Sequence, residues 1–145
     1  MRITTQGEYG IRCMVCIAKR PADTPVSIQT ITDEEALPKN YAEQLLLRLR
    51  RGGLIRSVRG AKGGYMLSRN SKLITLKEML IALEGSVFEI ACDRRESKGN
   101  IPCAHDHCCS LNPIWHAIRR QLSVFLDGIS LFQLVEAESE SEKAF

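Results

Sequence analysis

The sequence lacks any apolar run of about 18 residues, the length that a membrane-spanning helix requires. Its N-terminus, MRITTQGEYG, has neither the apolar core nor the small-residue cleavage site of a signal peptide. Internal repeats are also absent. We therefore expect a cytoplasmic protein with no membrane partner, in a compartment where thiols stay reduced.

Acidic residues are scarce in the first half of the chain. Residues 1–72 contain 13 Lys and Arg against 6 Asp and Glu, whereas residues 73–145 contain 7 against 11. A basic half on a chain of net charge +3 is typical of a protein that binds a polyanion such as nucleic acid. The alternative is a solvated basic surface that binds nothing.

Three short helices are predicted before the first glycine pair. Apolar residues at three- and four-residue spacing predict a helix over residues 5–19. Ser27 is a suitable N-cap for a second helix, and Pro38 fits the first turn of a third helix that ends at Gly52. This arrangement predicts a helix-turn-helix.

A glycine-rich hairpin is predicted directly after the third helix, in LIRSVRGAKGGYMLSR. Its tip carries Arg59 and Lys62 beside glycines that allow close approach to a phosphate or a groove wall. A hairpin in this place is the wing of a winged helix; the alternative is a hairpin with a mobile tip. We expect a mainly α fold with one small β-hairpin.

The rest of the chain predicts a fourth helix, TLKEMLIALEG, and a long helix, NPIWHAIRRQLSVFLDGI. The long helix places Ile114, Ile118, Leu122 and Phe125 on one face, which is too much apolar surface for an isolated helix and favours packing against a second copy. The predicted organisation is a DNA-binding domain at 1–84, a cysteine-rich loop at 85–110, a dimerisation helix region at 111–135 and a disordered acidic tail at 136–145.

The cysteine-rich loop, called the cysteine segment below (residues 85–110), holds four cysteines and two histidines. Thiolates are preferred ligands of iron–sulfur clusters and of structural zinc. The run CAHDHCC can chelate zinc with Cys103, His105 or His107, and Cys108 or Cys109; alternatively the histidines are plain loop residues. The pair Cys13 and Cys16 lies on an amphipathic helix and is interpreted as core thiols.

Several stretches together resemble the Rrf-two family of bacterial transcription regulators. They are MRITTQGEYGIR, YAEQLLLRLRRGGLIRSVRGAKGGY, TLKEMLIALEG and the cysteines before PIW, and the likeness extends to about residue 135. The resemblance implies a homodimer of winged-helix subunits, crossed through the long C-terminal helix, that binds palindromic operators in double-stranded DNA. It also implies an iron–sulfur cluster, 2Fe–2S or 4Fe–4S, near the dimer interface. The wing departs from the family's Gly-Pro-Gly-Gly-Gly-Tyr tip, because this chain has GAKGGY.

The resemblance also implies a ligand set for the cluster. The family's last two cysteines are separated by five residues, and the third lies six before a tryptophan, which matches Cys103, Cys109 and Trp115. Cys92 corresponds to the first cysteine, although the gap to Cys103 is longer than usual. The fourth ligand implied is Glu8 of the partner subunit; the alternative for Glu8 is a solvent-facing residue stabilised by the helix dipole.

For DNA, the third helix is expected to enter the major groove with its N-terminal end. Gln44 can read adenine, Glu43 can accept from cytosine or repel a phosphate, and Lys39 suits guanine or phosphate. The resemblance implies operator recognition by Glu43 and Gln44, and a minor-groove contact by Arg59. The residues expected to contact DNA are Arg2, Thr4, Thr5, Ser27, Lys39, Asn40, Tyr41, Glu43, Gln44, Arg59, Lys62, Gly63 and Gly64.

The function predicted is a homodimeric DNA-binding transcription regulator whose operator binding is modulated by an iron–sulfur cluster, sensing redox state, nitric oxide or iron–sulfur status. The alternative is a zinc-binding or thiol-redox regulator without such a cluster. An enzyme is not expected, because the sequence places no general base on a rigid scaffold and shows no substrate-pocket signature.

Overall fold

The computed structural model describes residues 3–93, 103–105 and 108–144. Its first three helices are α1 (Thr5–Ala18), α2 (Ile28–Glu35) and α3 (Lys39–Arg51). Side-chain oxygens of Thr4 and Ser27 cap α1 and α2, and Pro38 is the N-cap of α3. Ala36, in the left-handed conformation with φ of 51°, makes the turn between α2 and α3. These three elements are the predicted helix-turn-helix.

A two-stranded antiparallel hairpin follows, with strands β1 (Ile55–Val58) and β2 (Gly64–Leu67). Its register pairs Ile55 with Leu67 and Val58 with Gly64. Val26, just before α2, pairs with Tyr65 through two backbone hydrogen bonds of 2.8 and 2.9 Å. This bridge fixes the hairpin against the helix-turn-helix, so the predicted wing is confirmed.

The second half contains a 3-10 turn η1 (Ser71–Leu73) and the helices α4 (Leu76–Glu84), α6 (Asn112–Asp127) and α7 (Leu131–Lys143). Thr75 with Glu78, and Ser130 with Gln133, form capping boxes at the starts of α4 and α7. An isolated bridge between Thr75 and Ser130 places these two helix starts side by side. The chain therefore returns to the N-terminal domain after α6.

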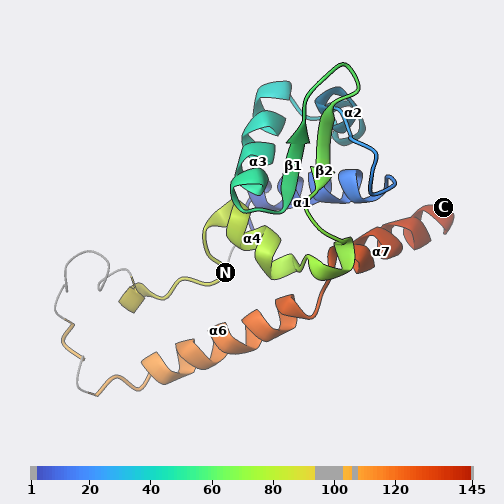
Figure 1. Ribbon diagram of the computed structural model, residues 1–145. Coiled ribbons are helices and arrows are strands. Elements are labelled where there is room, and N and C mark those ends of the chain that lie inside the picture. Colours follow the sequence, from blue (N-terminus) through green and yellow to red (C-terminus); the bar gives the residue numbers. More distant parts are fainter. Residues whose placement is uncertain (1–2, 94–102, 106–107, 145) are drawn as a thin grey trace.

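The hydrophobic core lies among α1, α2, α3, α4, β1 and the first turn of α7. Its fully buried large side chains include Met14, Ile31, Leu45, Leu46, Leu49, Leu54, Ile74, Met79, Leu83 and Leu131. Because Leu131 belongs to this core, we call α1–α4, the hairpin and α7 the winged-helix body. α6, with the described residues of the cysteine segment, forms an arm that extends away from it below α4 (Figure 1).

The acidic tail differs from the sequence-based expectation of disorder, because α7 continues to Lys143. Lys19 of α1 pairs with Glu138 at 3.0 Å and with Glu142 at 3.3 Å, which ties the acidic half of α7 to the body. Alanine, glutamate and lysine are also good helix formers. The expectation was wrong because composition alone did not show that a lysine 119 residues earlier, Lys19, faces the tail. Among the described helices, none is long and apolar enough to cross a bilayer.

Candidate functional site

The N-terminal end of α3 presents polar side chains to solvent. Lys39, Asn40, Glu43 and Gln44 are exposed. The opposite face of the helix is buried through its leucines, so packing fixes which face turns outward. An exposed polar stripe at the positive end of a helix that follows a tight turn has the shape required to enter a major groove.

Tyr41 behaves differently from its neighbours on α3. It is half-buried, and its ring lies edge-on to that of Tyr9, with centroids 6.4 Å apart at 81°. This contact packs the start of α3 on α1. A DNA contact by the exposed part of Tyr41 remains a prediction.

The tip of the wing carries Arg59 and Lys62, both exposed. Two adjacent glycines make the tight return possible. A Cβ on Gly63 would come within 2.2 Å of the Val58 carbonyl oxygen, and one on Gly64 within 2.2 Å of the Val26 carbonyl oxygen. These glycines are needed by the fold itself, and the two cations lie beside a backbone that can approach DNA closely.

Of the other predicted DNA contacts, Thr5 is exposed, and Arg2 lies outside the described residues. Thr4 and Ser27 both serve as helix caps, since Thr4 Oγ1 accepts from the Gly7 N–H and Ser27 Oγ from the Thr30 N–H. The structure therefore gives these two hydroxyls a role inside the fold. Their contacts with DNA stay predictions.

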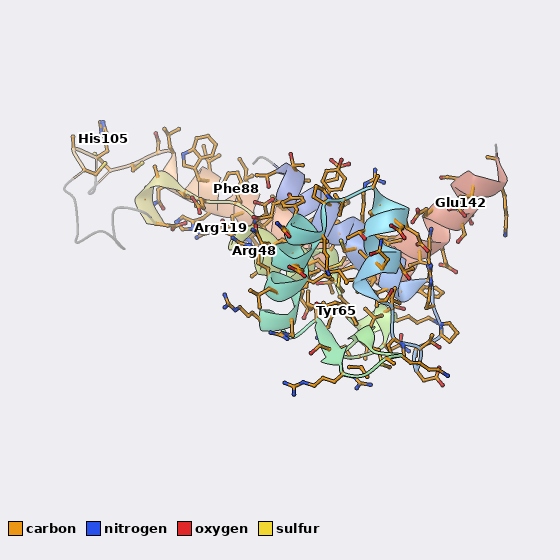
Figure 2. The ribbon with its side chains drawn as sticks, turned by 90° about the horizontal axis from the view of Figure 1, so that it is seen from above. Arg48, Tyr65, Phe88, His105, Arg119 and Glu142 are labelled. Carbon is orange, nitrogen blue, oxygen red and sulfur yellow. The ribbon has the colours of Figure 1, made fainter. Side chains whose placement is uncertain are left out.

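The cysteine segment begins on the body and ends at α6. Cys92 is half-buried, and next to it Asp93 accepts from Arg119 of α6 at 2.5 Å and from the Ile90 N–H at 3.3 Å. Arg119 and Phe88 line one cleft of about 520 Å³ between α4, the cysteine segment and α6 (Figure 2). An ion pair thus anchors the residue beside Cys92 to the arm's helix.

The remaining predicted ligands lie just before α6. Cys103 and Cys109 are half-buried, Cys108 and His105 are exposed, and His107 lies outside the described residues. None of the six cysteines, all of which the structure describes, forms a disulfide bond. Figure 2 shows His105 at one extremity of the molecule and Glu142 at the other, so His105 lies far from the core.

The donor chemistry fits an iron–sulfur cluster or zinc, because three cysteines outside any disulfide precede α6 and the positive end of this helix favours thiolate ligands. Within the residues that the structure describes, no three Cys, His, Asp or Glu side chains are close enough together to hold a metal ion. The donors that the structure describes in one subunit therefore do not form a complete site by themselves.

Glu8, the predicted ligand from the partner subunit, lies in the first turn of α1 with its side chain 62% exposed. Its carboxylate is 3.4 Å from the Arg12 guanidinium, one turn further along the helix. Glu8 lines a groove between α1 and α7 on the body. Within one subunit it belongs to a different region from the cysteine segment, which agrees with a role across an interface.

The pair Cys13 and Cys16 lies in the core, as predicted, with 0% and 1% exposure. Burial raises the pKa of each thiol to about 12. A nearby Glu35 charge adds to the effect at Cys13, and a hydrogen bond from Cys16 Sγ to Glu34 Oε2 of 3.2 Å adds to it at Cys16. These thiols are kept protonated, and they hold α1 against α2.

Sequence reasoning missed Arg119, Arg48 and Glu84. Arg48 Nη1 donates to the Leu83 carbonyl at 3.4 Å, and Glu84 accepts from Thr4. Their partners lie 26 to 80 residues away in the chain. No local pattern could have identified them, because a charged residue on a helix reads simply as solvated.

Comparisons with known proteins agree with this geometry. The HTH-type transcriptional regulator IscR of Yersinia pseudotuberculosis is 32% identical over 144 residues, which cover 99% of this chain and 85% of the relative. Among solved structures, CymR, the global cysteine regulator of B. subtilis, matches with a TM-score of 0.75 at 30% identity, covering 94% of this chain and 98% of that one. T. potens IscR matches with a TM-score of 0.70 at 27% identity, covering 97% and 90%.

The comparisons and the winged helix together establish the class of protein. The family model described as "Rrf2: Iron-dependent Transcriptional regulator" matches residues 3–137, nearly the whole chain. With its exposed recognition helix and basic wing, this chain belongs to the Rrf2 family of DNA-binding transcription regulators.

Proposed function

We propose that this regulator works in the cytoplasm as a homodimer on palindromic operators, and that an iron–sulfur cluster modulates its operator binding. The ligands proposed are Cys92, Cys103, Cys109 and Glu8 of the partner subunit. The observation that carries the proposal is the pairing of an exposed recognition surface with three cysteines, none of them in a disulfide, just before α6. When bound, such a cluster supplies a group that reacts with oxidants and nitric oxide.

The apolar face of α6 supports the homodimer. The side chains of Ile114, Ile118 and Phe125 lie on one face of α6, which the body leaves uncovered. They are therefore 51%, 41% and 65% exposed. Covering such a face with its copy makes a self-complementary interface. A two-fold dimer places two α3 helices on two half-sites, which explains a palindromic operator.

On DNA, the proposed contacts divide into two kinds. Asn40, Glu43 and Gln44 face the base edges of the major groove, while Arg59 and Lys62 on the wing supply charge to the backbone and the minor groove. Replacing Arg59 with Ala is expected to weaken operator binding by about 5- to 100-fold and to lower its salt dependence. The control is Lys143→Ala, at the end of α7, which should leave the affinity unchanged.

The metal proposal is tested by purifying the protein without oxygen and measuring visible absorption with iron, sulfide and zinc contents. Iron and sulfide in equal amounts, lost in Cys103→Ala and in Cys109→Ala, would support the cluster. Cys108→Ala is a matched control, because Cys108 adjoins Cys109 but lies outside the proposed ligand set. Glu8→Ala tests the fourth ligand, and operator affinity with and without metal tests the modulation.

A second candidate is a zinc-binding or thiol-redox regulator without iron. Two observations favour it: Cys108 is exposed beside half-buried Cys109, and the structure of an oxidised form of Staphylococcus aureus CymR matches this chain with a TM-score of 0.68 at 35% identity. Colourless protein with stoichiometric zinc would support the CAHDHCC site. Colourless, metal-free protein whose DNA binding responds to oxidants would support the thiol switch.

A further inference from the structure

The last turn of α4 lies where three parts of the chain meet. It contacts the start of α1 on one side and the end of α3 on another, and it leads through Gly85 into the cysteine segment. Gly85 ends the helix in the left-handed conformation with φ of 83°, and its N–H donates to the Ile81 carbonyl at 2.9 Å. The cysteine segment therefore departs from a turn that also supports the DNA-contacting elements.

Glu84 ties this turn to the start of α1. Its Oε1 accepts from the Thr4 backbone N–H at 3.2 Å and from the Thr4 hydroxyl at 2.5 Å. A carboxylate at the C-terminal end of its own helix is unfavourable, but this one lies at the positive N-terminal end of α1, which offsets the penalty. The same Thr4 hydroxyl caps α1 by accepting from the Gly7 N–H. The position of exposed Thr5, the next residue, thus depends on Glu84.

Two glycines of α1 permit this close packing. A Cβ on Gly7 would lie 2.5 Å from Glu84 Oε1, and a Cβ on Gly10 would lie 2.3 Å from the Leu83 side chain. Distances this short are not tolerated between real atoms, so a larger residue at either position must displace the Glu84 carboxylate or the Leu83 side chain. The contact between the two helices is therefore close and sensitive to small displacements.

The recognition helix joins the same turn. Arg48 of α3 donates to the Leu83 carbonyl at 3.4 Å, and Gln6 of α1 donates to that same carbonyl through Nε2. This carbonyl belongs to the end of α4, where the helix itself offers no partner. A Cβ on Gly52, just after α3, would lie 2.7 Å from the Ala82 Cβ. One carbonyl thus links α4, α1 and α3.

We propose that the last turn of α4 carries the state of the cysteine segment to the DNA-contacting surface of the same subunit, with Glu84 as the positioning residue. The inference rests on the proposed function, because it requires a metal- or thiol-dependent change in the segment. Cys92 lies eight residues after Glu84, and the Asp93–Arg119 ion pair holds the far side of this stretch to α6. A displacement of the segment's start changes the Glu84–Thr4 and Leu83–Arg48 bonds together.

The test uses the full-length protein, reconstituted with iron and sulfide without oxygen or left metal-free. The variants are Glu84→Gln, which removes the charge, and Gly7→Ala, which displaces the same carboxylate from the α1 side. The matched control is Glu140→Gln, at an exposed position of α7. The probes are a duplex selected by the wild-type protein from a random library and an unselected duplex, with dissociation constants measured by fluorescence anisotropy at fixed salt.

For the wild type and for Glu140→Gln, we expect metal loading to change affinity for the selected duplex by about 5- to 150-fold, the usual range of coupling between sites. In Glu84→Gln and Gly7→Ala, the ratio of the dissociation constants of the metal-free and metal-loaded protein should fall below about threefold. Visible absorption and affinity for the unselected duplex should stay as in the wild type. Circular dichroism confirms that each variant folds, and if Gly7→Ala does not, Gln6→Leu, which removes the bond to the Leu83 carbonyl, replaces it.

If both variants keep the wild-type ratio of dissociation constants, the proposed coupling through the last turn of α4 is overturned, while the proposed function stands. A wild-type protein indifferent to metal and to oxidants would instead overturn the proposed function. In that case metal-free Glu84→Gln decides the positioning role: weakened binding of the selected duplex alone supports it, and unchanged binding overturns it.

Discussion

The winged-helix body and the arm differ in how far their apolar side chains and thiols are buried within one subunit. In the body, the thiols of Cys13 and Cys16 are buried, and capping boxes close the starts of α4 and α7. In the arm, Leu126 is the buried residue of α6 while Val124 and Phe125 are 66% and 65% exposed. The difference shows that the body is held by its own contacts, whereas α6 leaves apolar side chains uncovered, which the proposed second subunit would cover.

The largest expected contrast between the two regions is thiol reactivity in the metal-free protein. Cys108 is exposed and should react with a maleimide at the rate of a free thiol, whereas Cys13 and Cys16 should react at least about 1,000-fold more slowly because they require opening of the core. Peptide mass spectrometry at timed intervals measures the rates. All should react alike in denaturant, and rapid labelling of Cys13 in the native protein would contradict the comparison.

A second contrast concerns α6. The double substitution Ile118→Asp with Phe125→Asp should abolish the dimer and weaken operator binding at least about 100-fold, because each subunit then binds its half-site alone. Light scattering coupled to gel filtration gives the mass, and anisotropy gives the affinity. Arg120→Asp, on the polar face of the same helix, is the control. A double variant that remains a dimer would show that the apolar face of α6 is not the dimer interface.

The buried thiols also predict a pH dependence of the body's stability. Their pKa is raised from 9.0 to about 12, so between these values the folded state binds more protons than the unfolded chain. The free energy of unfolding is then unaffected below pH 9 and falls above it, by up to ~1.4 kcal/mol per pH unit for each thiol.

Urea unfolding at pH 8, 9 and 10 under reducing conditions measures this decline. The control is the double variant Cys13→Ala with Cys16→Ala, whose profile should be flatter although its stability is lower. Identical slopes in the two proteins would show that other groups cause the decline.

The smallest expected effect concerns the acidic half of α7. Lys19→Met removes both ion pairs to Glu138 and Glu142, which are partly exposed, so global stability should fall by less than about 1 kcal/mol. Hydrogen exchange in the last turns of α7 should accelerate. Unchanged exchange there would mean that helix propensity alone keeps the tail folded.

Much of the body could be predicted from the sequence because its signals are local. Ser27, Pro38 and the glycines after Arg51 mark helix ends, and the spacing of Leu45, Leu46 and Leu49 sets the buried face of α3. The hairpin follows from its glycines and from strand-forming residues on either side. The family's cysteine spacing led to Cys103 and Cys109, which the structure leaves half-buried and outside any disulfide.

Contacts between distant residues could not be predicted in this way. Glu84 with Thr4, Arg48 with Leu83, Asp93 with Arg119 and Lys19 with the tail join residues that no periodicity or motif relates. Each contact joins a charged or polar group to a partner that lies close to it only because the elements of the core pack together. In the tail, the contacts of Lys19 accompany a helix where the acidic run was expected to be disordered.

The sequence by itself determined the winged helix, the exposed polar face of α3 and the thiols before α6, because capping, periodicity and spacing act over a few residues. Only the tertiary structure decided that α7 packs on α1, and that the end of α4 joins the cysteine segment to the DNA-binding elements. Burial and long-range hydrogen bonds depend on how the elements pack, and that packing exists only once the chain has folded.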